Sequence, residues 1–401
     1  MTRILNVLFD ERVGGPQLRV LQVARQLRQR GVETHVVIPK GDPQFASMLS
    51  EGGIPCHQLD LVRLRQTFRP LPHVRFATQF WPNVCSLTCL IRRHRIQIVH
   101  TNGLMHLQAA VAARLGAVPL VWHLNDVETP PLVLPIFPRL VRRWADSVAV
   151  AAAAVSRHCF PNGTEPKGWT HVLYAPVDTE KFSPEPGTRV RAEFGIPADT
   201  PLVGAVANFS PGKGLEYLLE AAPTIKERYP KAKFLFVGEM LENRRSYWQA
   251  LLRRREQLGL ATDIIFTGRR NDMSEVYRAM TLLVQASEAE ACPMAVMEAG
   301  ASGLPVVATE VGGTPELVEH GLTGLLIAPR NPARIAEAVI DVFSDPGRAR
   351  RMGLAAAERM RRYFSLDRCV EAHIRLYESV LRRRPFTASA KEAPRETLIH
   401  Q

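Results

Sequence analysis

Long apolar runs are absent from this 401-residue sequence, which limits the classes of protein that it can encode. The longest such run, Val148–Val155, has eight residues, whereas a membrane-spanning helix needs about 20. The first apolar segment, Ile4–Phe9, contains Asn6 and is followed by two acidic residues, so we expect no secretory signal peptide. We therefore expect a cytoplasmic protein without a transmembrane helix.

Cysteine is scarce and its spacing forms no motif. The six cysteines include no Cys-x-x-Cys pair and no spacing typical of a metal site. Because 46% of the residues are apolar, the chain can build large cores without disulfides. We expect reduced thiols, which also suits the cytoplasm.

Acidic residues are under-represented in the first half of the chain. Residues 1–178 contain 20 Lys and Arg against 11 Asp and Glu, whereas the remainder contains 31 against 28. A basic half either faces an anionic partner or is simply solvated. Because no zinc knuckle, basic recognition helix or aromatic RNA-binding signature is present, we do not expect nucleic acid to be that partner.

The first half alternates short apolar segments with longer amphipathic ones. After the first apolar segment and Gly14-Gly15, Pro16 opens a predicted helix that Gly31 closes. The apolar face of this helix consists of Val20, Val23, Ala24 and Leu27. Buried strands are predicted at Ile4–Phe9, Val32–Ile38, Ile96–His100, Pro119–His123 and Ser147–Val150.

The pattern begins again after a segment rich in Pro, Gly and charge at Pro176–Pro201. Further strands are predicted at Leu202–Ala207, Lys233–Gly238, Asp263–Gly268, Leu282–Gln285, Pro305–Ala308 and Leu325–Ala328. Alternation of strands and helices indicates parallel sheets covered on both faces.

We therefore expect an α/β protein with two doubly wound, Rossmann-like domains and a ligand cleft at the carboxyl ends of both sheets. The predicted division is a first Rossmann-like domain at 1–180 and a second at 186–364. A C-terminal helix at 365–384 is expected to pack back toward the first domain, and residues 385–401 are expected to form a disordered tail.

Two glutamates flank a predicted helix start in the segment Ser287–Ala299. Pro293 suits the first helical position, and the free N–H groups there attract a phosphate. Glu290 precedes that start and Glu298 lies within the helix, so each can accept from paired hydroxyls, one set on a sugar and the other on a ribose. The same residue types also fit a solvated helix, or the acid and nucleophile of a glycosidase.

The seven-residue spacing of Glu290 and Glu298 resembles the Glu-x7-Glu motif of the GT4 family of retaining glycosyltransferases, which have the GT-B fold. The run 298–326 is similar to the C-terminal domain of that family almost position for position, and the similarity extends to about residue 382. The resemblance implies a hexosyltransferase that uses a UDP-, GDP- or ADP-sugar, and that needs no further cofactor. It also implies that the domain at 1–180 binds the acceptor and that the domain at 186–364 binds the nucleotide sugar.

Other site residues follow from the same resemblance. Lys213, in Ser210–Gly214, resembles the family's diphosphate-binding Lys, and Gly14-Gly15 resembles its N-terminal glycine loop. His123 resembles a His near the reacting sugar, and Gly268–Asp272, with Arg269, resembles the loop that holds the base. Without the resemblance, these would read as an exposed Lys, a turn, a core His and a solvated loop.

Three departures from the family pattern concern the donor diphosphate. Asn208 stands where an Arg is common, so Arg269 or another basic residue is expected to compensate. Cys292 and Pro293 stand where the family commonly has an aromatic residue and a glycine. With Met294 and Ala295, these two residues are expected to line the donor phosphate at the helix start.

The resemblance also implies a mechanism. His123, Glu290 and Lys213 are expected to act in catalysis, and no Asp-x-Asp motif is present for a catalytic metal. A donor phosphate oxygen is then expected to accept the acceptor's proton. A degenerate sugar-nucleotide-binding partner protein, a nucleotide-sugar 2-epimerase and a glycosidase remain as alternatives.

The expected acceptor is a glycan or a lipid-linked saccharide of cell-surface polysaccharide synthesis. Two basic amphipathic stretches, 63–95 and 132–144, are able to lie on an anionic membrane surface. They fit equally well as ordinary helices with a basic outer face. We expect the protein in the cytoplasm, with peripheral contact to the inner face of the membrane.

Overall fold

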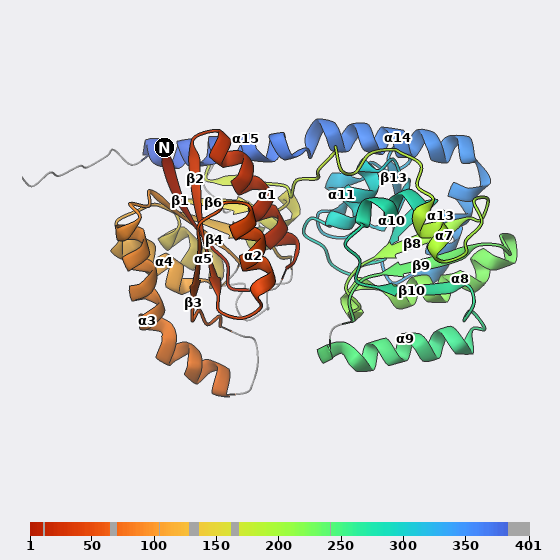
Figure 1. Ribbon diagram of the computed structural model, residues 1–401, viewed down its shortest axis with the longest axis horizontal. Coiled ribbons are helices and arrows are strands. Elements are labelled where there is room, and N and C mark those ends of the chain that lie inside the picture. The colour runs from red at the N-terminus through yellow and green to blue at the C-terminus, as the bar shows by residue number, and fades with distance from the viewer. Residues whose placement is uncertain are drawn as a thin grey trace, which may run out of the picture.

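The computed structural model describes residues 1–10, 13–64, 70–103, 105–127, 136–161, 168–240 and 242–383. Within these ranges the chain forms two separate parallel sheets, of seven and six strands. Helices cover both sheets, and the two resulting bodies lie side by side (Figure 1). The α/β fold with two Rossmann-like domains is confirmed.

The first sheet has the strand order β3-β2-β1-β4-β5-β6-β7, and all of its strand pairs are parallel. Its strands are β1 Thr2–Val7, β2 Val32–Pro39, β3 Cys56–Leu59, β4 Ile98–Asn102, β5 Leu120–Leu124, β6 Ser147–Val150 and β7 Thr170–Val172. Its helices are α1 Gly15–Gln29, α2 Pro43–Glu51, α3 Pro70–Arg93, α4 Leu107–Leu115, α5 Phe137–Trp144 and α6 Ala153–Cys159. The first strand pairs with both β2 and β4, with Ile4 opposite Thr34 and Ile98, so the order reverses there.

The second sheet has the order β10-β9-β8-β11-β12-β13, again entirely parallel. Its strands are β8 Leu202–Val206, β9 Lys233–Val237, β10 Ile264–Gly268, β11 Leu282–Gln285, β12 Val306–Thr309 and β13 Gly324–Ile327. Its α-helices are α7 Arg189–Glu193, α8 Leu215–Arg228, α9 Arg245–Gln257, α10 Met273–Ala279, α11 Met294–Ala301, α12 Thr314–Leu317, α13 Pro332–Ser344 and α14 Pro346–Tyr363. Two short 3₁₀ turns, η2 Pro211–Lys213 and η3 Glu242–Arg244, follow β8 and β9.

The last helix, α15 Leu366–Arg383, returns to the first sheet. Its apolar residues Val370, Leu376 and Val380 share a buried cluster with Ile4 of β1 and Val23 of α1. In Figure 1, α14 and α15 run along one edge of both bodies, α14 over the second and α15 over the first. The chain therefore crosses between the bodies twice, and the crossings touch where the Val177 N–H donates to the Phe364 carbonyl at 2.9 Å.

A carboxylate of the second body also contacts the first. Glu316 of α12 accepts hydrogen bonds from the Ala153 and Ala154 N–H groups, at 2.8 and 2.7 Å, and from the Tyr174 hydroxyl at 2.8 Å. The N-cap residue of α6 is Ala152, whose side chain cannot cap the helix. Glu316 therefore caps α6 from the other body.

All eleven predicted strands are present, each within two residues of its predicted bounds. The predicted apolar face of α1 is also confirmed, since its four residues are at most 4% exposed. Two strands were not predicted from the sequence, β3 and β7, which are the edge strands of the first sheet. Both are short and only half-buried, so they lack the apolar run that reveals a central strand.

Some of the sequence predictions lie outside the described residues. These are the disordered tail at 385–401, residues 65–69 of the first basic stretch, and residues 132–135 of the second. Among the helices that the structure describes, none is long and apolar enough to cross a membrane.

Candidate active site between the two sheets

A cleft of about 880 Å³ opens between the two bodies, lined by residues of both. It lies at the carboxyl ends of the strands where each sheet reverses its order, the usual ligand position in such folds. From the first sheet come residues that follow β1 and β4, including Asp10 and Asn102. From the second come residues that follow β8 and β11, including Asn208 and Glu290.

Two helix N-termini meet across this cleft. Gly14 caps α1 with an extended backbone, and Pro293 caps α11 in the same way. The two starts are so close that a Cβ added to Gly15 would lie 3.3 Å from the Met294 sulfur. Since the first N–H groups of a helix have no partner within it, the two starts together favour an anion.

The predicted position of Pro293 is wrong by one residue. It is the N-cap of α11 rather than its first helical residue, since its ψ of 108° is extended. Its carbonyl accepts the first helical bonds, from the Val296 and Met297 N–H groups. The N–H groups left free by the helix are therefore those of Met294 and Ala295, which follow the proline.

Lys213 and Glu290, two of the predicted site residues, form an ion pair in the cleft. The Lys213 Nζ lies 2.6 Å from Glu290 Oε1, and the side chains are 34% and 13% exposed. Ser287 Oγ donates to the same Oε1 at 2.8 Å, and Gln285 Nε2 donates to Ser287 Oγ at 3.0 Å. The other carboxylate oxygen of Glu290 receives neither of these contacts, which leaves an acceptor for a ligand hydroxyl.

Glycines hold the backbone of these two residues in place. Next to Lys213, Gly214 has a φ of +63°, and an added Cβ would lie 2.1 Å from the Ala286 carbonyl oxygen. At Gly312, with a φ of +50°, an added Cβ would lie 1.8 Å from the Glu290 carbonyl oxygen. The Gly313 N–H then donates to that same carbonyl at 2.9 Å. Neither contact leaves room for a side chain.

Glu298 lies in the body of α11 and is not among the residues that line the cleft. Its Oε2 accepts from the Tyr277 hydroxyl of α10 at 2.9 Å. Burial raises the pKa of this carboxyl to about 7, although the Tyr277 hydrogen bond and the charge of Lys181 act in the opposite direction. Glu298 is therefore a half-buried carboxyl whose ionisation depends on its surroundings.

Arg19, a buried cation of the cleft wall, was not predicted from the sequence. Only 4% exposed, it lines the cleft from the first turns of α1. Its Nη1 donates to His123 Nε2 at 3.0 Å and to Asn125 Oδ1 at 2.9 Å, and its Nη2 donates to Asn102 Oδ1 at 2.6 Å. These partners are neutral, so the guanidinium keeps its charge available to an anion in the cleft.

His123 stands behind Arg19 rather than in the cleft wall. It is fully buried, and burial together with the Arg19 charge holds its pKa well below the usual range. A neutral His123 that accepts from Arg19 has its proton on Nδ1, which faces His100 Nε2 at 3.0 Å. His100 in turn contacts the Tyr377 hydroxyl of α15 at 2.7 Å. The structure thus connects His123 to the site through Arg19.

Cys292 and Arg269 differ in their relation to the cleft. Cys292 lines it, and burial raises the pKa of its thiol to about 12, so the group stays neutral and is no nucleophile. Arg269 is exposed, does not line the cleft, and lies 3.9 Å from Glu239. Among the residues that the structure describes, the cations that line the cleft besides Lys213 are Arg19, Arg63 and Arg244.

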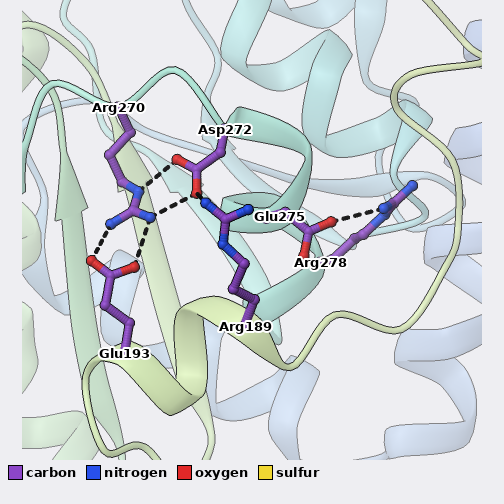
Figure 2. Close-up of polar contacts among 6 residues, drawn as sticks. All are labelled: Arg189, Glu193, Arg270, Asp272, Glu275 and Arg278. Carbon is purple, nitrogen blue, oxygen red and sulfur yellow. Dashed lines mark hydrogen bonds and ion pairs between the residues drawn. The ribbon is translucent and has the colours of Figure 1, made fainter.

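Arg270, the next residue, fixes the loop that carries Arg269 to the second body. Figure 2 shows Arg270 between two carboxylates: Glu193 of α7, at 2.7 and 2.8 Å, and Asp272, at 2.9 and 2.7 Å. Arg189 of α7 also pairs with Asp272, at 3.2 Å. Hydrogen bonding to Arg270 lowers the pKa of both carboxyls, so the cluster stays ionised at neutral pH. Arg270 therefore has a structural role, and it orients the loop after β10.

Two family models match the chain in succession. The model described as "Glycosyl transferase 4-like domain" matches residues 14–159, and the one described as "Glycosyl transferases group 1" matches residues 188–359. The first match begins at Gly14, and the second contains Lys213, Glu290 and Glu298.

Curated relatives and solved structures agree with these matches. A GDP-mannose-dependent α-(1-6)-phosphatidylinositol monomannoside mannosyltransferase of Mycolicibacterium smegmatis is 29% identical over 71% of this chain and 76% of its own length. A D-inositol 3-phosphate glycosyltransferase of Acidothermus cellulolyticus is 28% identical over 95% and 89%. The crystal structure of Anabaena HepE in complex with UDP-glucose is 24% identical, covers 94% of this chain and 100% of its own, and has a TM-score of 0.81.

Proposed function

This chain belongs to the nucleotide-sugar glycosyltransferases that join a 4-like domain to a group 1 domain, and from that premise we propose a specific reaction for it. It moves a hexose from a UDP-, GDP- or ADP-sugar to an acceptor, with retention of the anomeric configuration and without a catalytic metal. The acceptor is a glycan or a lipid-linked saccharide.

The observation that carries this proposal is the placement of the Lys213–Glu290 pair beside the two facing helix starts. A sugar diphosphate has an anionic centre with hydroxyls on one side. The helix starts and Lys213 match the anionic centre, and Glu290 matches the hydroxyls of the transferred sugar. The cleft volume of about 880 Å³ lies within the range of ligand sites.

Lys213 and the helix starts also stabilise the nucleotide diphosphate as it leaves the sugar. Negative charge develops on the diphosphate as the glycosidic bond breaks, and Lys213 and the N–H groups of Met294 and Ala295 stabilise it. Lys213 and Met294 both line the cleft, which supports this role. Arg19 adds a buried charge from the opposite wall and takes the place of the Arg that Asn208 replaces. The departing phosphate oxygen is then the base that accepts the acceptor's proton.

Glu298 and His123 have supporting roles in this proposal. Glu298 holds the ribose hydroxyls, since an ionised carboxylate accepts from both of them at once. His123 is a positioning residue, because it keeps Arg19 directed at the cleft through the 3.0 Å contact with Nη1.

A donor screen tests the proposed function. UDP-glucose and GDP-mannose come first, because relatives and neighbours bind or use them by name, and ADP-glucose completes the set. We expect one donor to raise the melting temperature and to release nucleotide when acceptors are added. A protein that binds donors but turns over none would be the degenerate partner protein instead. Sugar release without any dependence on the nucleotide would indicate a glycosidase.

Retention is tested by the sugar that forms first. Many transferases hydrolyse their donor slowly when no acceptor is present, and proton NMR distinguishes the two anomers before they interconvert. An α-linked donor should give the α-anomer at early times. If the β-anomer appears first, the enzyme inverts and the proposed role of the phosphate oxygen is wrong.

One face of α3 suits the proposed membrane contact. Leu71, Val74 and Trp81 are 76%, 57% and 61% exposed, and their spacing places them on one side of the helix. Arg75 on the same helix is also exposed. An exposed apolar stripe beside basic residues suits an anionic lipid surface, on which a lipid-linked acceptor would be presented.

Sedimentation with anionic vesicles tests this contact. Binding at low salt should fall at high salt, and Trp81→Ser should reduce it several-fold. Leu354→Ser on α14, where the side chain is 49% exposed, is the matched control and should bind as the unchanged protein does. Equal binding of both variants, or no binding at any salt, would contradict membrane contact through α3. It would leave the sugar-transfer proposal untouched.

A further inference from the structure

Three histidines from separate parts of the first body come together outside the cleft. His35 lies on β2, His57 on β3, and His94 just after the end of α3. One ring nitrogen from each can be chosen so that all three lie within 4.8 Å of one another. None of the three lines the cleft, and their separation in the sequence forms no motif.

The distances suit a small divalent ion. His35 Nδ1 and His57 Nε2 are 3.1 Å apart and form a hydrogen bond between the two rings, which a bound ion would replace. Ligand nitrogens on a tetrahedral zinc ion, at the usual Zn–N distances of 2.0–2.1 Å, are about 3.3–3.4 Å from one another. The His94 ring lies 4.7 and 4.9 Å from the other two, measured between centroids. A small rotation of the His94 side chain therefore brings one of its ring nitrogens to an ion held by His35 and His57.

A carboxylate stands behind the cluster, as it does behind many metal-bound histidines. Glu33 Oε2 lies 3.9 Å from His35 Nε2 and is held by Arg3 Nε at 3.0 Å. This arrangement favours the His35 tautomer whose proton is on Nε2, and so leaves Nδ1 free toward His57. Glu33 also offsets part of the positive charge that a metal ion would add beside Arg3.

The donor set indicates which metal fits. Cys56, next to His57, packs into the core beneath α1 and α2, on the other face of the sheet. The cluster therefore offers imidazoles without a thiolate. His57 and His94 are only half-buried, so water can complete the coordination. Three imidazoles and a water suit zinc among the common divalent ions, and do not suit magnesium or calcium.

We propose that His35, His57 and His94 bind a zinc ion that ties the C-terminal end of α3 to strands β2 and β3. This ion stabilises the first body and fixes the base of α3. It has no part in sugar transfer, so the proposal is independent of the proposed function.

Metal content and thermal stability of the full chain test this proposal. The protein is purified without a histidine tag, stripped with a chelator, and mixed with zinc chloride. We expect about one zinc per chain after removal of excess metal, and a rise in melting temperature of roughly 5 °C or more. Magnesium chloride and calcium chloride at the same concentration should give no shift.

Variants then assign the site. His57→Gln and His94→Gln should each lower zinc affinity at least 10-fold and remove the thermal shift. His73→Gln, an exposed histidine on α3, is the matched control and should keep both. Absence of bound zinc in the unchanged protein would overturn the proposal whether or not the variants fold. Equal zinc binding by all three variants would overturn it as well, since the ion would then bind elsewhere.

Discussion

At the scale of single residues, the ionisation of Glu298 makes the free energy of unfolding depend on pH. Its folded-state pKa of about 7 lies above the ordinary glutamate value of about 4.3, which the unfolded chain would have. Between these two values the folded state therefore holds more protons than the unfolded state. The free energy of unfolding must then fall as pH rises through this window.

Replacement by an uncharged residue should remove this dependence. Glu298→Gln keeps an acceptor for Tyr277 and never ionises, so it should be more stable than the unchanged protein at pH 8 by about 2–3 kcal/mol, and nearly equal to it at pH 4.5. Urea unfolding at the two pH values measures this difference. Glu337→Gln, at a side chain 61% exposed, controls for loss of a surface charge. A stability gain that is the same at both pH values would contradict the account.

The functional residues differ in how far the sequence could reveal them. Glu290, Glu298 and Lys213 occur in local runs whose spacing can be recognised, so they could be predicted. Arg19 could not, because its partners Asn102, His123 and Asn125 lie 83 to 106 residues away in the sequence. Nothing in its helix distinguishes it from the other arginines of α1 before the fold brings those partners together.

At the scale of elements, the loop after β12 supports the donor site through its backbone. Gly312 fits against the Glu290 carbonyl, where any Cβ would come within 1.8 Å. The loop before β13 contains a useful contrast in Gly321, whose φ of +80° is also left-handed but whose Cβ would meet nothing within 4 Å. Both glycines have a left-handed backbone, which disfavours other residues. Only at Gly312 would a side chain also clash with a neighbouring atom.

Alanine at these two positions should therefore behave differently. Gly321→Ala should cost about 1–2 kcal/mol of unfolding free energy, the ordinary cost of a left-handed alanine. Gly312→Ala should cost more than that and should also weaken donor binding, because the Glu290 backbone has to move. Chemical unfolding and calorimetric titration with the donor measure both effects. Donor affinity that is equal in the two variants would argue against this role of the loop.

Strands could be predicted from the sequence where their burial produces a run of apolar residues. The central strands are continuous apolar runs, because helices cover both faces of a parallel sheet. Edge strands β3 and β7 have polar residues and little burial, so their pairing depends on neighbours that the sequence does not display. The start of α11 was misplaced by one residue, since a proline fits both the N-cap and the first helical position.

At the scale of the whole molecule, Glu316 controls how the two bodies meet. It accepts two N–H groups of α6 and the Tyr174 hydroxyl, and Arg157 lies 3.3 Å away. Burial and this contact raise the pKa of Tyr174, so the hydroxyl remains a donor. Because these bonds join the two bodies, a large change in the angle between the bodies must break them.

Loss of this carboxylate should open the molecule. Glu316→Ala should lower the free energy of unfolding by about 1–3 kcal/mol, since it leaves buried N–H groups without an acceptor. Small-angle scattering should show a larger radius of gyration, and KM for the donor should rise. Glu319→Ala is the control, because its side chain is 55% exposed and pairs with Arg359 of the same body. An unchanged radius of gyration in Glu316→Ala would contradict the account.

In the proposed mechanism Lys213 stabilises the departing nucleotide diphosphate beside Glu290, and nucleotide release by Lys213→Met measures this role. With the donor found in the screen, kcat/KM should fall about 100- to 1,000-fold, the usual loss when one charge-stabilising donor is removed. Lys231→Met, at a side chain 78% exposed in the same body, should retain full activity. If Lys213→Met folds normally and releases nucleotide at the unchanged rate, Lys213 does not support the leaving group and the proposed mechanism is wrong.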